Sequence, residues 1–257
     1  MLRTESELLE IIEGLREPFT ASAPTHDREA SFPAASFELL REQGMLALTA
    51  PIELGGEGLW SGDRFLTYYR LLSALAAFDA NTSQLLQVHS HALGILSNAA
   101  TPAQRELYLE PIIRGGKVLA SVGSESAPST NSTGLYNQEL QPQDDGSWLL
   151  TCEKHFASVS AGADYLLIWL AVPGDAPYEM RTVCVVVPAD APEVELIDNW
   201  DVLGMRATVS WTVRVKNLRL PAEAIIGEPG YWVRDDPRTY SHGLAANPLG
   251  EAEGTLA

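Results

Sequence analysis

The sequence has 257 residues, enough for one large domain or two ordinary ones; 46% are hydrophobic and 20% are charged. This balance is typical of a globular chain with a sizeable core and excludes disorder as its main description. The formal net charge of −17 would repel nucleic-acid phosphates and anionic lipid. We therefore expect neither nucleic acid nor a membrane among the partners of this protein.

The cysteines and the apolar runs point to a reducing, aqueous compartment. Cys152 and Cys184 are far apart, and neither has a Cys or His at metal-ligand spacing, so we expect no disulfide framework and no metal site. The N-terminal residues lack the basic start and apolar stretch of a signal peptide. The longest apolar run, residues 165–172, is too short to cross a bilayer. The sequence therefore predicts a cytoplasmic protein.

Helix signals dominate the first part of the chain. Thr4 with Glu7 forms a capping-box pattern, and Thr101 with Gln104 forms another that opens a helix ending at Gly115. Between them, a helix begins near residue 33, and apolar side chains recur at helical spacing over residues 65–75 and 85–95. These patterns predict an all-α domain over residues 1–117.

After this region the hydrophobic period changes from 3.6 to 2. Strands are predicted over residues 118–123, 165–172, 182–187 and 208–216, and Asp145-Gly146 is typical of a hairpin turn between residues 135–141 and 147–152. Because no helical pattern separates the strands, we expect an antiparallel β-sandwich or barrel over residues 118–227. The predicted fold class is α+β.

The last residues, 228–257, form a third segment. Turn-forming residues come first, and a helix pattern begins near residue 240. A lone helix at a terminus buries little surface, so we expect this one to be marginal by itself.

The loop after the first predicted strand, residues 121–131, is rich in hydroxyl-bearing and small residues. Such a loop can direct backbone N–H groups and hydroxyls toward an anionic or carbonyl-rich ligand. It can equally be a polar connection without a ligand, and composition leaves both interpretations open.

Several motifs resemble the acyl-CoA dehydrogenase family. Ser124-Glu125 and Thr130-Asn131 fall on the outer positions of its flavin-binding segment, Thr-Glu-Pro-x-Ala-Gly-Ser-Asp. Residues 150–158, Leu-Thr-Cys-Glu-Lys-His-Phe-Ala-Ser, are similar to its Leu-Asn-Gly-x-Lys-x-Trp-Ile-Thr. Further similarity lies at residues 49–58, 89–94, 103–116, 203–208 and 215–221. The resemblance covers nearly the whole chain.

This resemblance implies a flavoprotein, with FAD as the hydride acceptor, that dehydrogenates an acyl-CoA thioester between its α and β carbons. At the matching positions, Gly123 would contribute backbone, Ser124 would bond the flavin pyrimidine edge and Thr130 would lie near the pyrophosphate. Phe156 would pack beside the flavin, and Ser158 would lie near its N5 atom. Together with His89, Thr130 would also border the substrate.

A second interpretation is a flavin monooxygenase of the same fold, which would use FMN. In such enzymes a histidine and a serine near N5 stabilise a flavin hydroperoxide, and His89 with Ser158 would fit that role. His89 can instead be a structural histidine that hydrogen-bonds on its helix face.

In most members of the family a third, helical domain carries the catalytic base and subunit contacts. Residues 249–257 resemble only its first helix, so we expect a truncated C-terminal domain and assign no catalytic residue for dehydrogenation. Such a chain would be inactive alone, and would form a homo-oligomer or associate with a chain that supplies the helical domain. A third interpretation is a non-catalytic remnant that binds a partner.

Overall fold

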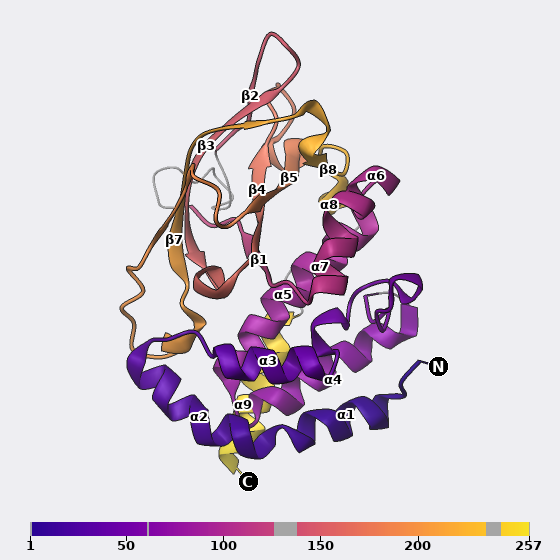
Figure 1. The fold of residues 1–257 in the computed structure, drawn as a ribbon, viewed down its shortest axis with the longest axis vertical. Coiled ribbons are helices and arrows are strands. Elements are labelled where there is room, and N and C mark those ends of the chain that lie inside the picture. Colours follow the sequence, from indigo (N-terminus) through magenta and orange to yellow (C-terminus); the bar gives the residue numbers. More distant parts are fainter. Residues whose placement is uncertain (1, 61, 126–137, 235–242, 257) are drawn as a thin grey trace.

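The structure is a computed structural model that describes residues 2–60, 62–125, 138–234 and 243–256. Helices gather at one end of the molecule and β-sheets at the other, and both chain ends lie on the helical side (Figure 1). This arrangement confirms the predicted α+β fold class.

The helices before the sheets follow the predicted order. In the described residues they are α1 (Glu5–Gly14), α2 (Arg16–Glu29), α3 (Ala34–Glu42), α4 (Phe65–Ala76), α5 (Ala80–Ala99), α6 (Pro102–Gln104) and α7 (Glu110–Gly115). Both predicted capping boxes are present, at Thr4 with Glu7 and at Thr101 with Gln104. A π-helical turn, Arg105–Leu109, joins α6 to α7.

Helix α2 has no counterpart among the predicted helices. Phe19 is its buried residue, Pro24 lies inside it, and its other side chains are mostly polar. Such a helix lacks the apolar stripe on which prediction from periodicity depends. The packing of Phe19 against Phe78, with ring centroids 6.2 Å apart, helps to fix α2 on the helical core.

Within the described residues the strands form two four-stranded sheets. The first has the order β1 (Leu119–Val122), β4 (Tyr165–Ala171), β5 (Thr182–Pro188), β8 (Ile225–Ile226). The second has the order β2 (Gln141–Pro142), β3 (Trp148–Ala157), β7 (Trp211–Leu220), β6 (Val194–Ile197). The predicted hairpin turn joins β2 to β3, with Gly146 at φ +83°; part of its expected first strand, residues 135–137, lies outside the described residues.

The prediction of antiparallel pairing throughout is wrong for one pair. β1 runs parallel to β4, with Leu119 opposite Tyr165 and Val122 opposite Ile168. Parallel neighbours require a long crossover connection, usually a helix. Here the chain passes through β2 and β3 of the other sheet before β4, so a hairpin serves as the crossover.

The C-terminal helix α9 (Gly243–Leu256) is firmly packed against α4 and α5 (Figure 1). Asn247 accepts a hydrogen bond from Ser83 Oγ at 2.7 Å and donates one to Gln84 Oε1 at 2.8 Å. A Cβ at Gly250 or at Gly254 would lie 1.9 Å from a carbonyl oxygen of α4 or of the residue after it. The terminal helix is therefore not a lone one, because its glycines allow the two backbones to approach closely; its marginal stability by itself stays a prediction.

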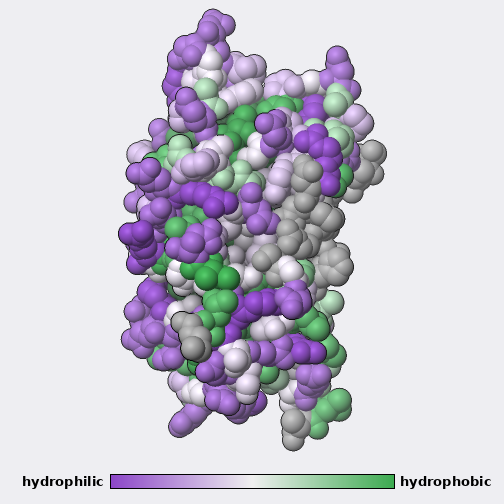
Figure 2. Space-filling model, turned by 90° about the vertical axis from the view of Figure 1, so that its right-hand side faces the viewer, coloured by the Kyte–Doolittle hydropathy of each residue, from purple (hydrophilic) through white to green (hydrophobic). Residues whose placement is uncertain are grey.

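A shorter helix, α8 (Tyr231–Arg234), follows the sheets and buries Trp232 against Trp169 of β4. The helical and sheet regions are also joined at α2, where Asp27 accepts hydrogen bonds from the backbone N–H and Nε of Arg206. Hydrophilic side chains predominate on the face in Figure 2, and hydrophobic ones gather in smaller patches. Among the described helices, none combines the length and the hydropathy needed to span a membrane.

We predict that Gly250→Ala lowers the free energy of unfolding by about 1–3 kcal/mol, because the added methyl group overpacks the contact with α4. The same change in an open helix normally raises stability by about 0.5–1 kcal/mol, so the two effects differ in sign. Gly14→Ala is the matched control, since a Cβ there meets nothing within 4 Å. Denaturant unfolding measures both; equal, small increases in stability would contradict the close packing of α9.

Candidate functional site

The turn between β3 and β4 has an unusual backbone. Phe156 and Val159 have φ values of +55° and +67°, in the left-handed region that non-glycine residues seldom occupy. The Val159 N–H donates to the Thr208 carbonyl at 3.0 Å, and the Ser158 N–H donates to the Phe156 carbonyl at 2.9 Å. Backbone strain of this kind persists where surrounding structure enforces it, and it clusters at functional sites.

The segment facing this turn, residues 200–210, is strained in the same way. Met205 has a φ of +57° and Val209 a φ of +41°. The Met205 carbonyl accepts three hydrogen bonds, from Trp200 Nε1 at 3.0 Å, Thr208 Oγ1 at 2.8 Å and the Thr208 N–H at 3.3 Å. Two strained segments therefore hold each other in place at the end of the β3–β7 ladder.

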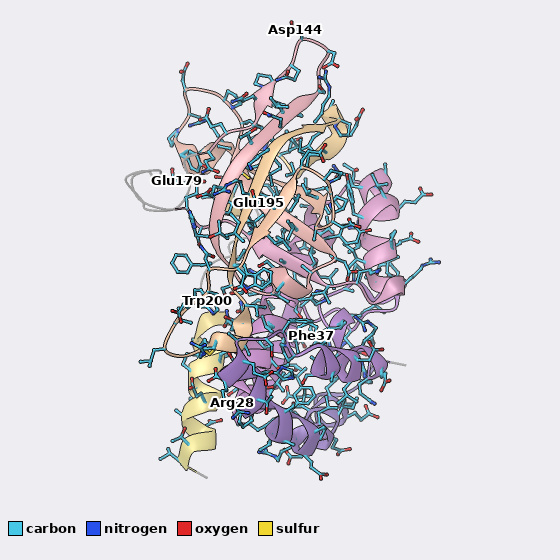
Figure 3. All side chains as sticks on the ribbon, turned by 60° about the vertical axis from the view of Figure 1, so that its left-hand side comes forward. Arg28, Phe37, Asp144, Glu179, Glu195 and Trp200 are labelled. Atoms are coloured by element: carbon cyan, nitrogen blue, oxygen red, sulfur yellow. The ribbon has the colours of Figure 1, made fainter. Side chains whose placement is uncertain are left out.

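An aromatic pair is presented at this end of the sheet. Phe156 is 65% exposed, and its ring meets Trp200 edge-to-face with centroids 5.9 Å apart. Trp200 lies on the loop where the sheets meet the helices (Figure 3). Because its indole N–H bonds Met205, Trp200 is fixed and in turn supports an exposed phenyl ring that would otherwise have few neighbours.

Three hydroxyl groups lie in a row beside the aromatic pair. Ser158 Oγ is 2.8 Å from Ser210 Oγ, which is 2.8 Å from Thr208 Oγ1. Ser210 and Thr208 are buried, whereas Ser158 is partly exposed. Ser158 is therefore the end of the row that a ligand can reach.

The end of β1 reaches the same edge. The Ser124 carbonyl accepts a hydrogen bond from the His155 N–H at 2.8 Å, which places Gly123 and Ser124 beside the start of the strained turn. The Ser124 side chain is exposed. The structure thus brings together four of the predicted site positions, Gly123, Ser124, Phe156 and Ser158, while Thr130 lies outside the described residues.

A buried ion pair lies beneath this edge. The Lys154 ammonium bonds Glu125 Oε1, and both side chains are fully buried. Burial lowers the pKa of Lys154, and the bond from Glu125 opposes that shift by favouring the charged form. Burial also raises the pKa of the neighbouring Cys152 to about 11, which keeps its thiol protonated and unreactive.

His89 lies in the core of α5 and is fully buried. Its Nδ1 accepts from the Leu119 N–H at 3.0 Å, so Nε2 carries the proton and donates to the Leu46 carbonyl at 2.8 Å. Burial lowers the pKa of His89 to about 4, so the ring stays neutral. This geometry matches the structural alternative, in which His89 joins α5 to β1.

His91 is partly buried, and its ring packs against Trp60 with centroids 5.1 Å apart.

Trp200, Thr208 and Ser210 were not predicted as site residues. The predicted strand over residues 208–216 begins later in the structure, at Trp211 of β7. Thr208 ends a 3-10 turn and Val209 is in the left-handed region, so the strained segment, and not strand alternation, brings the hydroxyls of Thr208 and Ser210 together. Nothing in the sequence connects Trp200 with Phe156, because they meet only through the loop geometry. Among the described residues, no group of three or more His, Cys, Asp or Glu side chains is placed to hold a metal ion.

Comparison with known proteins indicates the family. Residues 10–116 match the model of the acyl-CoA dehydrogenase N-terminal domain. Mouse mitochondrial short-chain specific acyl-CoA dehydrogenase is 26% identical over 235 residues, which span 90% of this chain and 55% of that protein. These matches support membership of the acyl-CoA dehydrogenase family.

Other relatives are monooxygenases. A dibenzothiophene monooxygenase of Rhodococcus erythropolis is 26% identical over 230 residues, 89% of this chain and 53% of that protein. The FMN-bound structure of TdsC from Paenibacillus sp. A11-2 has a TM-score of 0.83 at 26% identity, covering 97% of this chain and 63% of TdsC. Butyryl-CoA dehydrogenase of Megasphaera elsdenii shares the fold, with a TM-score of 0.86 at 21% identity, over 100% of this chain and 68% of that one. The chain spans about half the length of the curated relatives it matches.

We predict that His89 makes stability fall as the pH drops from about 6.5, its ordinary pKa, to about 4, its pKa in the folded protein. In this window the unfolded chain binds a proton that the folded chain excludes, which costs stability of roughly 3 kcal/mol at the acid end. Denaturant unfolding at several pH values measures the effect. In His89→Gln the dependence on pH should be weaker by that amount. His26→Gln, at a partly buried histidine of α2, is the control; an unchanged slope in His89→Gln would contradict the prediction.

We predict that Lys154→Met or Glu125→Gln alone lowers the free energy of unfolding by about 3–5 kcal/mol, because each leaves a polar or charged partner buried without its counterpart. The double variant should lose much less than the sum of the two. Glu195→Gln, which removes the exposed ion pairs with Arg214 and Lys216, should cost less than about 1 kcal/mol. Strict additivity of the two buried changes would show that the pair is not coupled.

Proposed function

We propose that this chain forms the flavin-binding part of a flavin-dependent oxidoreductase, with the flavin ring against the edge made by Ser124, Phe156 and Ser158. The observation that carries the proposal is the strained turn at residues 156–159, which holds an exposed aromatic ring, Phe156, and a partly exposed hydroxyl, Ser158, two residues apart. These groups fit a flavin, because an aromatic face packs against the ring system and hydroxyls bond its polar atoms. When bound, the flavin would supply the oxidation chemistry.

For the reaction, we propose monooxygenation of a small, uncharged apolar substrate with FMN as the flavin. Glu125 and Glu153, which lie nearest Ser124 and Phe156 in the sequence, are already paired: Glu125 with buried Lys154, and Glu153 with Arg214 at 2.7 Å. Asp201, which follows Trp200, is fully exposed and lies 3.6 Å from Arg206. Beside Phe156 the edge therefore offers the hydroxyls of Ser124 and Ser158, while the nearest carboxylates are engaged by cations. The net charge of −17 also disfavours a highly anionic substrate. The similarity to dibenzothiophene monooxygenases supports this choice.

The second candidate is dehydrogenation of an acyl-CoA thioester with FAD as the hydride acceptor. The similarity to mouse short-chain specific acyl-CoA dehydrogenase supports it. That reaction requires a carboxylate base for the proton α to the carbonyl. Neither Glu125 nor Glu153 suits this role while paired, so the base would have to come from outside this edge.

Flavin binding is the first test. Titration of the purified protein with FMN and FAD, followed by flavin fluorescence, should give saturable binding. Phe156→Ala should weaken it about tenfold, the equivalent of an aromatic contact of about 1.4 kcal/mol. Leu107→Ala is the matched control, since Leu107 is 62% exposed and lies beside α6, away from this edge. Equal binding by both variants would contradict the proposed site.

The two reactions can then be separated by their products. Reduced FMN, isotopically labelled oxygen and dibenzothiophene should give a product that contains the label if monooxygenation is correct. Acyl-CoA substrates with an artificial electron acceptor should give steady reduction of the acceptor if dehydrogenation is correct.

A further inference from the structure

The hydroxyl row at residues 158, 208 and 210 has a fixed direction. Each hydroxyl carries one hydrogen to donate, whereas a backbone carbonyl can only accept. The row ends at the Met205 carbonyl, 2.8 Å from Thr208 Oγ1, so the Thr208 hydroxyl donates its one hydrogen bond to that carbonyl. Ser210 must then donate to Thr208, and Ser158 must donate to Ser210.

The surrounding structure keeps this direction from reversing. Ser210 and Thr208 are 4% and 2% exposed, so solvent has little access to supply an alternative partner. Met205 is held by its further bonds from Trp200 Nε1 and the Thr208 N–H, and its backbone is in the left-handed region. The carbonyl that sets the direction is therefore fixed in space.

The fixed direction restricts Ser158 to accepting hydrogen bonds from a ligand. With its hydrogen committed to Ser210, its oxygen presents only lone pairs to the partly exposed side. A serine hydroxyl normally adapts to its ligand by rotating, but this one is restricted to accepting. It will discriminate between ligands that offer an N–H and ligands that offer a lone pair.

We propose that Thr208 and Ser210 are positioning residues that make Ser158 a hydrogen-bond acceptor, so that this site binds reduced flavin more tightly than oxidised flavin. The inference rests on the proposed function, together with the position near flavin N5 that the family resemblance implies for Ser158. Reduced flavin carries a hydrogen on N5 and can donate to Ser158. Oxidised flavin has only a lone pair on N5, which would face the lone pairs of Ser158.

Anaerobic titration of the wild-type protein with oxidised and with reduced FMN tests the inference. The dissociation constant should be about tenfold lower for reduced FMN, the size expected from one hydrogen bond of about 1.4 kcal/mol. The midpoint potential of bound FMN should accordingly lie about 30 mV above that of free FMN, since tenfold corresponds to 29.6 mV for two electrons.

Two variants abolish the fixed direction of the hydrogen bonds in the row while keeping Ser158 in place. In Ser210→Ala the Ser158 hydrogen is released, and in Thr208→Val the Ser210 hydrogen can turn toward Ser158 and release it. Both variants should lose most of the tenfold preference. Ser97→Ala is the matched control, because Ser97 is also 4% exposed and donates to a backbone carbonyl, Leu93 at 2.7 Å, within α5. It should keep the preference.

The results distinguish a failure of the inference on Ser158 from a failure of flavin binding itself. Equal affinity of the wild type for both redox forms, or a preference that persists in both variants, would overturn the inference on Ser158 and leave flavin binding intact. A wild-type protein that binds neither form would overturn the proposed function and this inference together.

Discussion

The buried ion pair between Glu125 and Lys154 is the constraint on which the geometry of the candidate site depends. Glu125 follows β1 of the first sheet, and Lys154 lies in β3 of the second. Removing both charges from water costs several kcal/mol for each ion, and only good geometry and additional hydrogen bonds recover it. The pair is therefore better understood as a device that fixes how the two sheets meet than as a net source of stability.

The position of this ion pair determines where the exposed ends of β1 and β3 lie. Glu125 is next to Ser124, and Lys154 is two residues before Phe156, so fixing the pair fixes the exposed ends of β1 and β3 together. The bond from the His155 N–H to the Ser124 carbonyl continues the same contact. The strained turn then needs one further support, from the segment at residues 200–210, through Val159 and Thr208. Strain of about 1–3 kcal/mol at each such residue can persist only in a frame this well determined.

The helical region depends on a different constraint, the close approach of backbones. Gly250 and Gly254 place α9 directly on α4, and Asn247 adds hydrogen bonds to α5. Through Leu119 and Leu46, buried His89 joins α5 to the start of the first sheet. A histidine with both nitrogens bonded to the main chain acts here as a structural connector between the helices and the sheets. In the sequence it was a candidate site residue because of the resemblance to flavin monooxygenases, in which a histidine and a serine lie near flavin N5.

Local features of the sequence were sufficient for the helices with caps and apolar stripes, for the β2–β3 turn and for the α+β class. They depend on neighbours within a few residues, as in the capping boxes at Thr4 and Thr101. Similarity of motifs indicated the family, and it selected Gly123, Ser124, Phe156 and Ser158 as candidate positions, which the fold brings to one edge of the sheet. The sequence did not predict helix α2, because α2 has no apolar stripe. It did not predict the parallel pairing of β1 with β4 either, because that pairing depends on where the chain returns to the first sheet.

The sequence by itself determined which side chains are available at the site, because residue types and their order are local. Only the tertiary structure decided what those side chains can do. Ser158 is an ordinary serine until Ser210, Thr208 and Met205, from 47 to 52 positions away, commit its single hydrogen. His89 is an ordinary histidine until two backbone segments occupy both its nitrogens. The physical reason is the same in both cases: a donor or acceptor has a fixed capacity, and only folding reveals which partners use it.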